Sequence, residues 1–435
     1  MKKHSLLKGA LNFSIGTGIS RILGLLREIV FAHFFGAGIA MDAFRVAFRI
    51  PNLLRDVLAE GTLTPAFVPM FADYHANKDK KTTTEFVSLI LGTMLLITGA
   101  ITLISIIFAP WLVKLVAYGF QGEKFLLTVK LTRILFPFLI FITVSALVMG
   151  VLNFFNHFFT TGIASCWFDV AIIGIGVALA PQFGITSIAI GALIGGALQL
   201  ISQFPQLRKE GYLVRPKFKF TPEVKKVLLL MMPIAIGYSA MKINTIINTL
   251  IASFLQDGVI AWLEYAFRIM WVPVGVLGVA LANVALPSAA KNLSGEHRKE
   301  FTKTIRTTFI YGVLCSIVST VLIWVLAYPV CKLLYQHGKF TPTDTINTAK
   351  ALQAYAMGIP GLILARILAT GFYALKDTKT PMIASFITVI VNVIFVLVLV
   401  KVIGFTGIPW ASSISNSVNA LWLGILLLKK LTPNR

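Results

Sequence analysis

Charged side chains are concentrated in one apolar stretch of the chain, MDAFRVAFRIPNLLRDVLAEG, from Met41 to Gly61. Its charged residues are Asp42, Arg45, Arg49, Arg55, Asp56 and Glu60. Similar charges elsewhere in apolar sequence are Arg21, Arg27, Glu28, Glu264 and Arg268. Arginine has a planar fork of N–H donors that can bind two phosphate oxygens at once. The residues therefore predict either a site for a phosphate-bearing anion or a set of ion pairs that lock helices together.

Helical spacing brings most of the first set together. At about 100° per residue, an α-helix places five of these side chains within about 60° of one another. They are Asp42, Arg45, Arg49, Asp56 and Glu60. Arg55 falls outside this polar stripe, but Pro51 removes a backbone hydrogen bond, and the resulting kink is expected to redirect Arg55 toward the same cavity.

The second half of the chain has its own candidate arginine. Glu264 and Arg268 have the i, i+4 spacing at which a carboxylate can brace a guanidinium group. Lys242 and Arg366 are further cations in apolar sequence, and the residues alone assign them no role. The use of arginine, where a purely structural pair could equally use lysine, favours the anion site over the packing interpretation.

Composition indicates the elements that must position these charges. The chain has 435 residues, of which 57% are hydrophobic and 13% charged, and its mean hydropathy is +0.84. These values are typical of polytopic membrane proteins and exclude a soluble globular domain. We expect an all-α protein with about twelve transmembrane helices, because apolar runs long enough to cross a bilayer recur throughout. The runs are 10–35, 41–71, 86–116, 127–155, 160–181, 186–206, 224–255, 259–288, 303–335, 346–374, 381–403 and 407–428.

The net charge of +22 has a topological explanation. Most lysines and arginines outside the apolar runs fall at the two termini and in alternate connections, such as Lys78–Lys81 and Arg208–Lys226. This asymmetry predicts that both termini lie in the cytoplasm. The basic loops then face anionic lipid headgroups, and no nucleic acid partner is needed to explain the charge.

An internal repeat predicts two lobes. The tetrapeptide Ala-Phe-Arg-Ile occurs at 47–50 and again at 266–269, and Pro110 and Gly119 recur at the same offset as Pro329 and Gly338. Six-helix halves, 1–218 and 219–435, would be related by a pseudo-two-fold axis along the membrane normal around a central cavity, a transporter architecture. Chance similarity in a chain rich in Phe, Leu and Ile is the alternative explanation.

Signatures of enzymes and of metal sites do not occur in the sequence. The chain contains no Gly-x-x-x-x-Gly-Lys-Ser/Thr loop, no His-Glu-x-x-His and no Gly-x-Ser-x-Gly. Cys166, Cys315 and Cys331 are odd in number and embedded in apolar runs, so we interpret them as packing residues. We therefore expect no enzymatic activity, no metal and no cofactor.

Four long segments resemble one known family. The stretch from Ser20 to Pro69, "GVLGVALANVALPS" (Gly275–Ser288), "LYQHGKFTPTDT" (Leu334–Thr345) and "GFYALKDTKTP" (Gly371–Pro381) occur in the order found in the MurJ/MviN family. Its members are the lipid II flippases of the bacterial cytoplasmic membrane. The resemblance implies the fold of the multidrug/oligosaccharidyl-lipid/polysaccharide exporter superfamily, with two six-helix lobes around a central cavity.

The resemblance also implies roles for particular residues. Arg27, Arg55 and Arg268 match the cavity arginines that are proposed to hold the substrate pyrophosphate. Arg21, Asp42 and Glu60 match positions important for transport. Glu28 and Arg49 join this candidate site through the charge pattern.

Three departures from the family pattern stand out. Glu28 occupies a position where the family often has Asp. The chain stops at "LLLKKLTPNR", without the two further C-terminal helices that are proposed to hold the lipid tail in many relatives. Helix 381–403 offers Asn392 but no carboxylate for the sodium ion that some relatives bind.

The implied activity is non-enzymatic transport. The substrate would be lipid II, an undecaprenyl-pyrophosphate-linked disaccharide-pentapeptide, moved from the cytoplasmic to the outer leaflet by alternating access. Membrane lipids and cell-wall synthesis proteins are the other expected partners, and either the membrane potential or a monovalent cation could drive the cycle. Two alternatives remain open: another exporter of the same superfamily, for lipid-linked oligosaccharides or drugs, and a non-transporting cell-wall scaffold.

Overall fold

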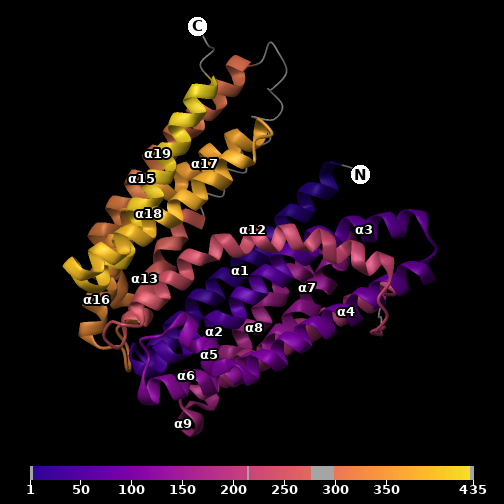
Figure 1. Ribbon diagram of the computed structural model, residues 1–435, viewed down its shortest axis with the longest axis horizontal. Coiled ribbons are helices and arrows are strands. Elements are labelled where there is room, and N and C mark those ends of the chain that lie inside the picture. Colours follow the sequence, from indigo (N-terminus) through magenta and orange to yellow (C-terminus); the bar gives the residue numbers. More distant parts are fainter. Residues whose placement is uncertain (1–2, 213–214, 276–297, 432–435) are drawn as a thin grey trace. The chain divides into compact units, whose positions relative to one another are not determined.

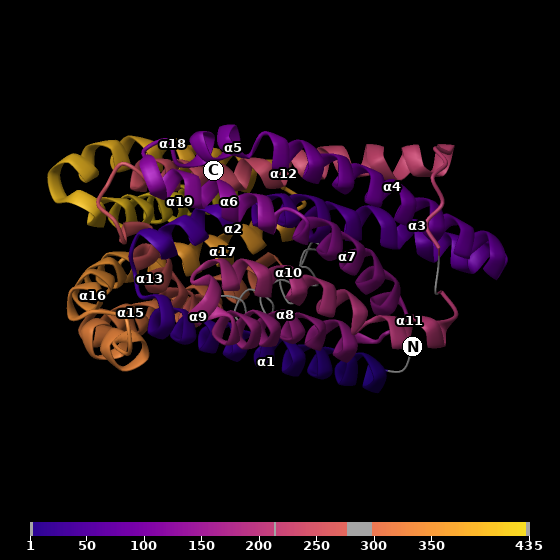
Figure 2. The same cartoon turned by 90° about the horizontal axis from the view of Figure 1, so that it is seen from below.

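The computed structural model of the chain describes residues 3–212, 215–275 and 298–431. Side chains are described from Gly18 onward, except those of Glu60, residues 240–241, residues 298–304 and residue 431. Apart from its first residue, the family-like segment Gly275–Ser288 therefore lies outside the described part. Every regular element within these ranges is a helix (Figures 1 and 2), which confirms the predicted all-α class.

The chain folds into two compact units. Unit 1 comprises residues 1–35 and 39–242, and unit 2 comprises residues 36–38 and 243–435. The helices of unit 1 are α1 (Lys3–Phe35), α2 (Ile39–Arg55), η1 (Asp56–Leu63), α3 (Thr64–Asn77), α4 (Lys80–Ile107), α5 (Ala109–Val116), α6 (Gly122–Leu135), α7 (Phe138–Phe154), α8 (Phe158–Ala178), α9 (Ala180–Phe183), α10 (Thr186–Ile201) and α11 (Phe204–Glu210). Helix α12 (Pro222–Ala252) belongs to unit 1 up to Lys242.

Unit 2 begins within α12 and continues to the C-terminus. Its further helices are α13 (Val259–Pro273), α15 (Arg298–Tyr335), α16 (Pro342–Ala356), α17 (Ile359–Ala374), α18 (Lys379–Ile403), η4 (Gly404–Thr406) and α19 (Gly407–Leu431). Helices α15, α17, α18 and α19 run side by side in Figure 1. In unit 1, α8 packs between α1 and α10, as Figure 2 shows.

The twelve predicted apolar runs coincide with single helices or with two or three successive helices, apart from the end of the run 259–288, which is not described. Prolines explain three of the breaks, since Pro110, Pro137 and Pro360 lie at or next to the breaks between α4 and α5, α6 and α7, and α16 and α17. Seven helical stretches of the described chain are long and apolar enough to cross a membrane, or eight if the bent α12 counts as one span. The exact number of twelve spans stays a prediction.

The charged stretch beyond Pro51 differs from the regular α-helix that was assumed for the polar stripe. Helix α2 continues through Pro51 to Arg55, and the hydrogen-bond pattern then changes to a π-helix at Asp56–Leu63. A π-helix turns less per residue than an α-helix, because each bond spans one more residue. The polar stripe calculated for an ideal α-helix therefore does not extend unchanged to Asp56 and Glu60.

The start of α12 packs into the core of unit 1. Val224, Val227 and Met231 are buried in a cluster with Phe67, Phe86 and other side chains of α3, α4 and α7. This packing explains why unit 1 extends to Lys242. The division of the chain into six-helix lobes 1–218 and 219–435 stays a prediction.

Two of the family-like segments have structural roles in unit 2. Thr341 caps α16 in a capping box with Asp344, whose carboxylate also accepts a hydrogen bond of 2.7 Å from the Trp262 indole. Asp377 accepts a hydrogen bond from the backbone N–H of Thr380 at the start of α18 and forms an ion pair with Lys430 near the end of α19. The hydrogen bond from Lys430 holds the pKa of Asp377 well below its ordinary value.

Candidate functional site

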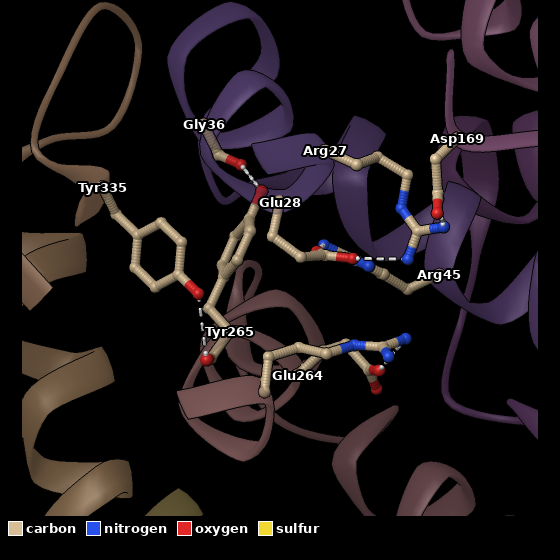
Figure 3. Close-up of polar contacts among 9 residues, drawn as sticks. Arg27, Glu28, Gly36, Arg45, Asp169, Glu264, Tyr265 and Tyr335 are labelled. Carbon is tan, nitrogen blue, oxygen red and sulfur yellow. Dashed lines mark hydrogen bonds and ion pairs between the residues drawn. The ribbon is translucent and has the colours of Figure 1, made fainter. Parts of the chain in front are cut away.

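Arg27 and Arg45 converge on one buried glutamate (Figure 3). The Arg27 Nη2 atom lies 3.1 Å from Glu28 Oε1, and the Arg45 guanidinium group donates to the other carboxylate oxygen. Arg27 Nη1 donates to Asp169 Oδ1 on α8 at 2.7 Å. Glu28 is completely buried, and only 12% of the Arg27 side chain is exposed. This network ties α1, α2 and α8 together, as the packing interpretation predicts.

Phenylalanine rings enclose the network. The Arg27 guanidinium carbon lies 5.9 Å from the ring centres of Phe31 and Phe168, and that of Arg45 lies 5.7 Å from Phe31. Phe48 stacks on Phe44 and on Phe168. Rings at these distances attract the cations and keep water away, which strengthens the ion pairs.

Asp42 is the second buried acid of the predicted site. It is 1% exposed, and its Oδ2 atom accepts a hydrogen bond of 2.8 Å from Lys124 on α6. The Lys124 ammonium group also lies 4.2 Å from the centre of the Phe120 ring. Asp42 thus connects the first turn of α2 to α6.

Arg55 belongs to a more open cluster. Arg55 Nη2 lies 3.0 Å from Asp56 Oδ1, and Lys242 Nζ lies 2.6 Å from Asp56 Oδ2. The exposed fractions are 25% for Arg55 and 32% for Lys242. Two cations therefore contact the carboxylate of Asp56. Lys242, to which the sequence analysis assigned no role, forms an ion pair with Asp56 in this cluster.

The remaining predicted residues of unit 1 lie near these two clusters along the chain. Arg21 is exposed on α1, and Arg49 is partly buried on α2 between Arg45 and Arg55. Glu60 lies in the π-helix, and its side chain is outside the described part of the structure.

In unit 2, Arg268 forms the predicted i, i+4 pair. Its Nη2 atom lies 3.4 Å from Glu264 Oε1, and its side chain is 45% exposed. The neighbouring Phe267 packs edge-on against Trp271 and Tyr355. Arg366 of α17 approaches the Trp271 ring, with its guanidinium carbon 5.9 Å from the ring centre.

Two partners of the candidate residues escaped the sequence analysis. Asp169 is a single acid in the apolar run of α8, which is itself a signal of a buried charge that needs a partner. Lys124 is 82 residues from Asp42 in the chain, and the fold brings the two together. The structure thus brings Arg27 and Glu28 together with Asp169, and Asp42 together with Lys124.

Comparison with known proteins identifies the family. The sequence profile described as "Lipid II flippase MurJ" matches residues 31–434, nearly the whole chain. The chain belongs to the MurJ family. This confirms the resemblance that was found in the segment Ser20–Pro69 and in the three later segments.

MurJ relatives match over most of their own length. A "Probable lipid II flippase MurJ" of Buchnera aphidicola subsp. Acyrthosiphon pisum is 36% identical over 431 residues, covering 98% of this chain and 84% of the relative. The one from Vibrio cholerae is 34% identical, covering 95% and 81%. "Lipid II flippase MurJ" of Burkholderia cenocepacia is 34% identical, covering 98% and 84%.

Solved structures support the same assignment. A lipid II flippase MurJ in an inward closed conformation superimposes with a TM-score of 0.84 at 31% identity, covering 96% of this chain and 88% of the other. An inward-facing multidrug transporter of the MATE family has a TM-score of 0.82 at 15% identity, covering 97% and 98%. The second likeness concerns the fold alone and agrees with the predicted all-α architecture.

Proposed function

We propose that this chain moves lipid II from the cytoplasmic to the outer leaflet of a bacterial cytoplasmic membrane. The observation that carries the proposal is the MurJ match over residues 31–434, together with relatives of that name at about one third identity. The intramembrane arginines supply the chemistry that such a substrate needs.

The pyrophosphate of lipid II would bind to the guanidinium groups. Arg55 and Lys242 are well placed in unit 1, because both are partly exposed and both contact Asp56. In unit 2, the proposed phosphate ligand is Arg268, which pairs with Glu264. Charge-assisted hydrogen bonds from arginine to phosphate oxygens are short, directional and roughly twice as strong as neutral ones.

Arg27 would join the substrate by exchanging partners. In the empty site, Glu28 and Asp169 neutralise Arg27 and Arg45, which avoids the cost of buried unpaired cations. A phosphate that replaced one of these carboxylates would keep the charge balanced. Arg21, Arg49, Asp42 and Glu60 would complete the site by orienting these groups and supporting α1 and α2.

Transport would require no covalent chemistry. Two six-helix lobes, 1–218 and 219–435, would rock between inward-open and outward-open states while the polyprenyl tail stayed in lipid. We propose that no cofactor takes part, that the membrane potential or a monovalent cation drives the cycle, and that both termini lie in the cytoplasm. Cell-wall synthesis proteins are the proposed macromolecular partners.

The test combines complementation with direct transport. Arg27→Ala, Arg55→Ala and Arg268→Ala should each fail to support growth of a flippase-depleted strain although the protein is inserted at normal levels. In proteoliposomes, each should lower lipid II transport by at least about tenfold, since a hydrogen bond to a charged group contributes ~1.5–3 kcal/mol. Lysine at the same positions should restore transport only in part, because it lacks the bidentate fork.

Arg133→Ala is the matched control. Arg133 donates to the backbone carbonyl of Ile106 through Nε at 3.1 Å and lies outside both charged clusters. This variant should support growth. Normal growth of the Arg55→Ala strain would remove Arg55 from the site, and transport of a different lipid-linked oligosaccharide in place of lipid II would overturn the substrate.

A further inference from the structure

A basic cavity lies at the start of α4, remote in sequence from the arginine clusters. Its volume is about 410 Å³, and its lining includes Lys80, Lys81, Lys217, Thr84, Ser88 and Glu85. The hydroxyl groups of Thr84 and Ser88 donate to carbonyls of their own helix, so the three ammonium groups are the donors left for a ligand. The lining is therefore suited to an anion that carries several oxygen acceptors.

The segment Arg215–Phe220, Arg-Pro-Lys-Phe-Lys-Phe, forms one wall of the cavity through Lys217. The backbone N–H of Lys217 donates to the carbonyl of Ser88 at 3.0 Å. Gly92 allows this close approach, because a Cβ atom there would lie 2.1 Å from the Lys217 carbonyl oxygen. The backbone of the segment is thus fastened to α4, while its side chains remain exposed.

Glu85 only partly offsets the positive charge. Its Oε1 atom lies 2.6 Å from Lys217 Nζ, and the two side chains are 50% and 54% exposed. An ion pair in such a setting is weak and easily exchanged. Lys80 donates to the backbone carbonyl of Glu210 at 3.2 Å and lies over the Tyr212 ring, and neither of these two contacts is with a carboxylate.

Exposed aromatic rings beside the lysines indicate where the anion comes from. Phe218 and Phe220 are 62% and 68% exposed, and each directly follows a lysine in the chain. A free phosphate ion would give these rings no partner. Aromatic and basic side chains occur together where a protein meets the headgroup region of a bilayer, since the rings enter the apolar side and the cations reach phosphates.

We propose that this cavity binds the phosphate of an anionic phospholipid headgroup, with Phe218 and Phe220 against the adjoining glycerol and acyl carbons. The lysines Lys80, Lys81 and Lys217 hold the phosphate oxygens, and the bound lipid fastens the connection between α11 and α12 to the membrane surface. Basic recesses between membrane helices are a known form of lipid headgroup site. The site is separate from the proposed transport site and does not depend on it.

The test is lipid binding to the purified full-length protein in detergent, measured by native mass spectrometry during titration with phosphatidylglycerol. The triple variant K80Q/K81Q/K217Q should bind at least about tenfold more weakly, since each lysine near an anionic headgroup contributes ~1 kcal/mol. The control K78Q/K225Q/K226Q removes the same charge from exposed lysines outside the cavity and should bind as the wild type does. Equal weakening in both variants would overturn the site, because bulk charge would then explain the binding.

Two further experiments test whether the bound phosphate belongs to a lipid or is a free ion. Sodium phosphate at millimolar concentration should not displace phosphatidylglycerol, and displacement would overturn the lipid assignment in favour of a free anion. F218S/F220S should bind the lipid several-fold more weakly than F159S/F183S, which removes two exposed phenylalanines elsewhere in unit 1. Equal binding by these two variants would show that the rings do not contact the lipid, and the proposal would be wrong.

Discussion

At the scale of single residues, Glu28 is the buried carboxylate that both Arg27 and Arg45 contact in unit 1. It is completely buried and accepts hydrogen bonds from both Arg27 and Arg45. Removing one partner from a buried charged network leaves an uncompensated charge in a medium of low dielectric constant. Glu28 is therefore expected to maintain the folded state of unit 1 as well as the orientation of the two arginines.

Glu28→Gln tests this directly. The variant keeps the size of the side chain but removes its charge, and we expect it to destabilise the protein by about 3–5 kcal/mol. Thermal unfolding of the purified protein in detergent would show a lower midpoint. Glu85→Gln, which disrupts a half-exposed pair with Lys217, should leave the midpoint almost unchanged. Equal midpoints for the two variants would mean that Glu28 does not neutralise the buried arginines.

At the scale of secondary-structure elements, the π-helix Asp56–Leu63 determines where the Asp56 side chain lies relative to α2. Asp56 is the carboxylate that Arg55 and Lys242 contact. The π-helix follows the α-helix that carries Arg45 and Arg49, and it changes the rotation between those residues and Asp56. Such π-helical turns are rare and often occur at functional sites. Here the change accompanies the pairing of Asp56 with Lys242 on α12.

Gly61 allows α12 to approach this π-helix. A Cβ atom at position 61 would lie 2.7 Å from the Asp56 carbonyl oxygen and 2.9 Å from the Tyr238 ring. We expect Gly61→Ala to cost about 1–3 kcal/mol of stability by overpacking and to lower transport. Thermal unfolding and lipid II transport in proteoliposomes would measure both effects.

Gly99→Ala is the matched control for that substitution. Gly99 lies within α4, and a Cβ atom there meets nothing within 4 Å. Alanine favours a helix by about 1 kcal/mol relative to glycine, so this variant should be at least as stable as the wild type. If Gly61→Ala were equally stable, the close contact between the π-helix and Tyr238 would not be important.

At the scale of the whole molecule, transport requires water to reach the charged stretch of α2. A scaffold protein would have no such need, so access from solvent separates the two functions. Asn52 lies on α2 between Arg49 and Arg55 and is partly buried. Its position makes it a suitable place for a cysteine that reports on a hydrated cavity.

Asn52→Cys, in a chain whose three native cysteines are replaced by alanine, should react with a membrane-impermeant maleimide. Reaction from at least one side of the membrane is expected, because alternating access opens the cavity to water. Leu103→Cys on the exposed apolar side of α4 should remain unlabelled. A transport-competent Asn52→Cys protein that failed to react from either side would contradict a water-filled route past α2.

Composition and local spacing predicted the class of the molecule and one ion pair between near neighbours in the chain. Apolar length and composition predicted the helices, and the i, i+4 spacing predicted the Glu264–Arg268 pair, because helix geometry alone brings these two residues together. The long segments from Ser20 onward led to the family, because a resemblance in residue order can be recognised without the fold.

The partners of the buried charges depend on how distant segments of the chain pack against one another. Asp169 is 142 residues from Arg27, Lys124 is 82 residues from Asp42, and Lys242 is 186 residues from Asp56. No periodicity extends over such separations, because these pairs depend on how separate helices pack. The sequence analysis did not predict the π-helix, in which Gly61 lies where a Cβ atom would be 2.9 Å from the ring of Tyr238 on α12.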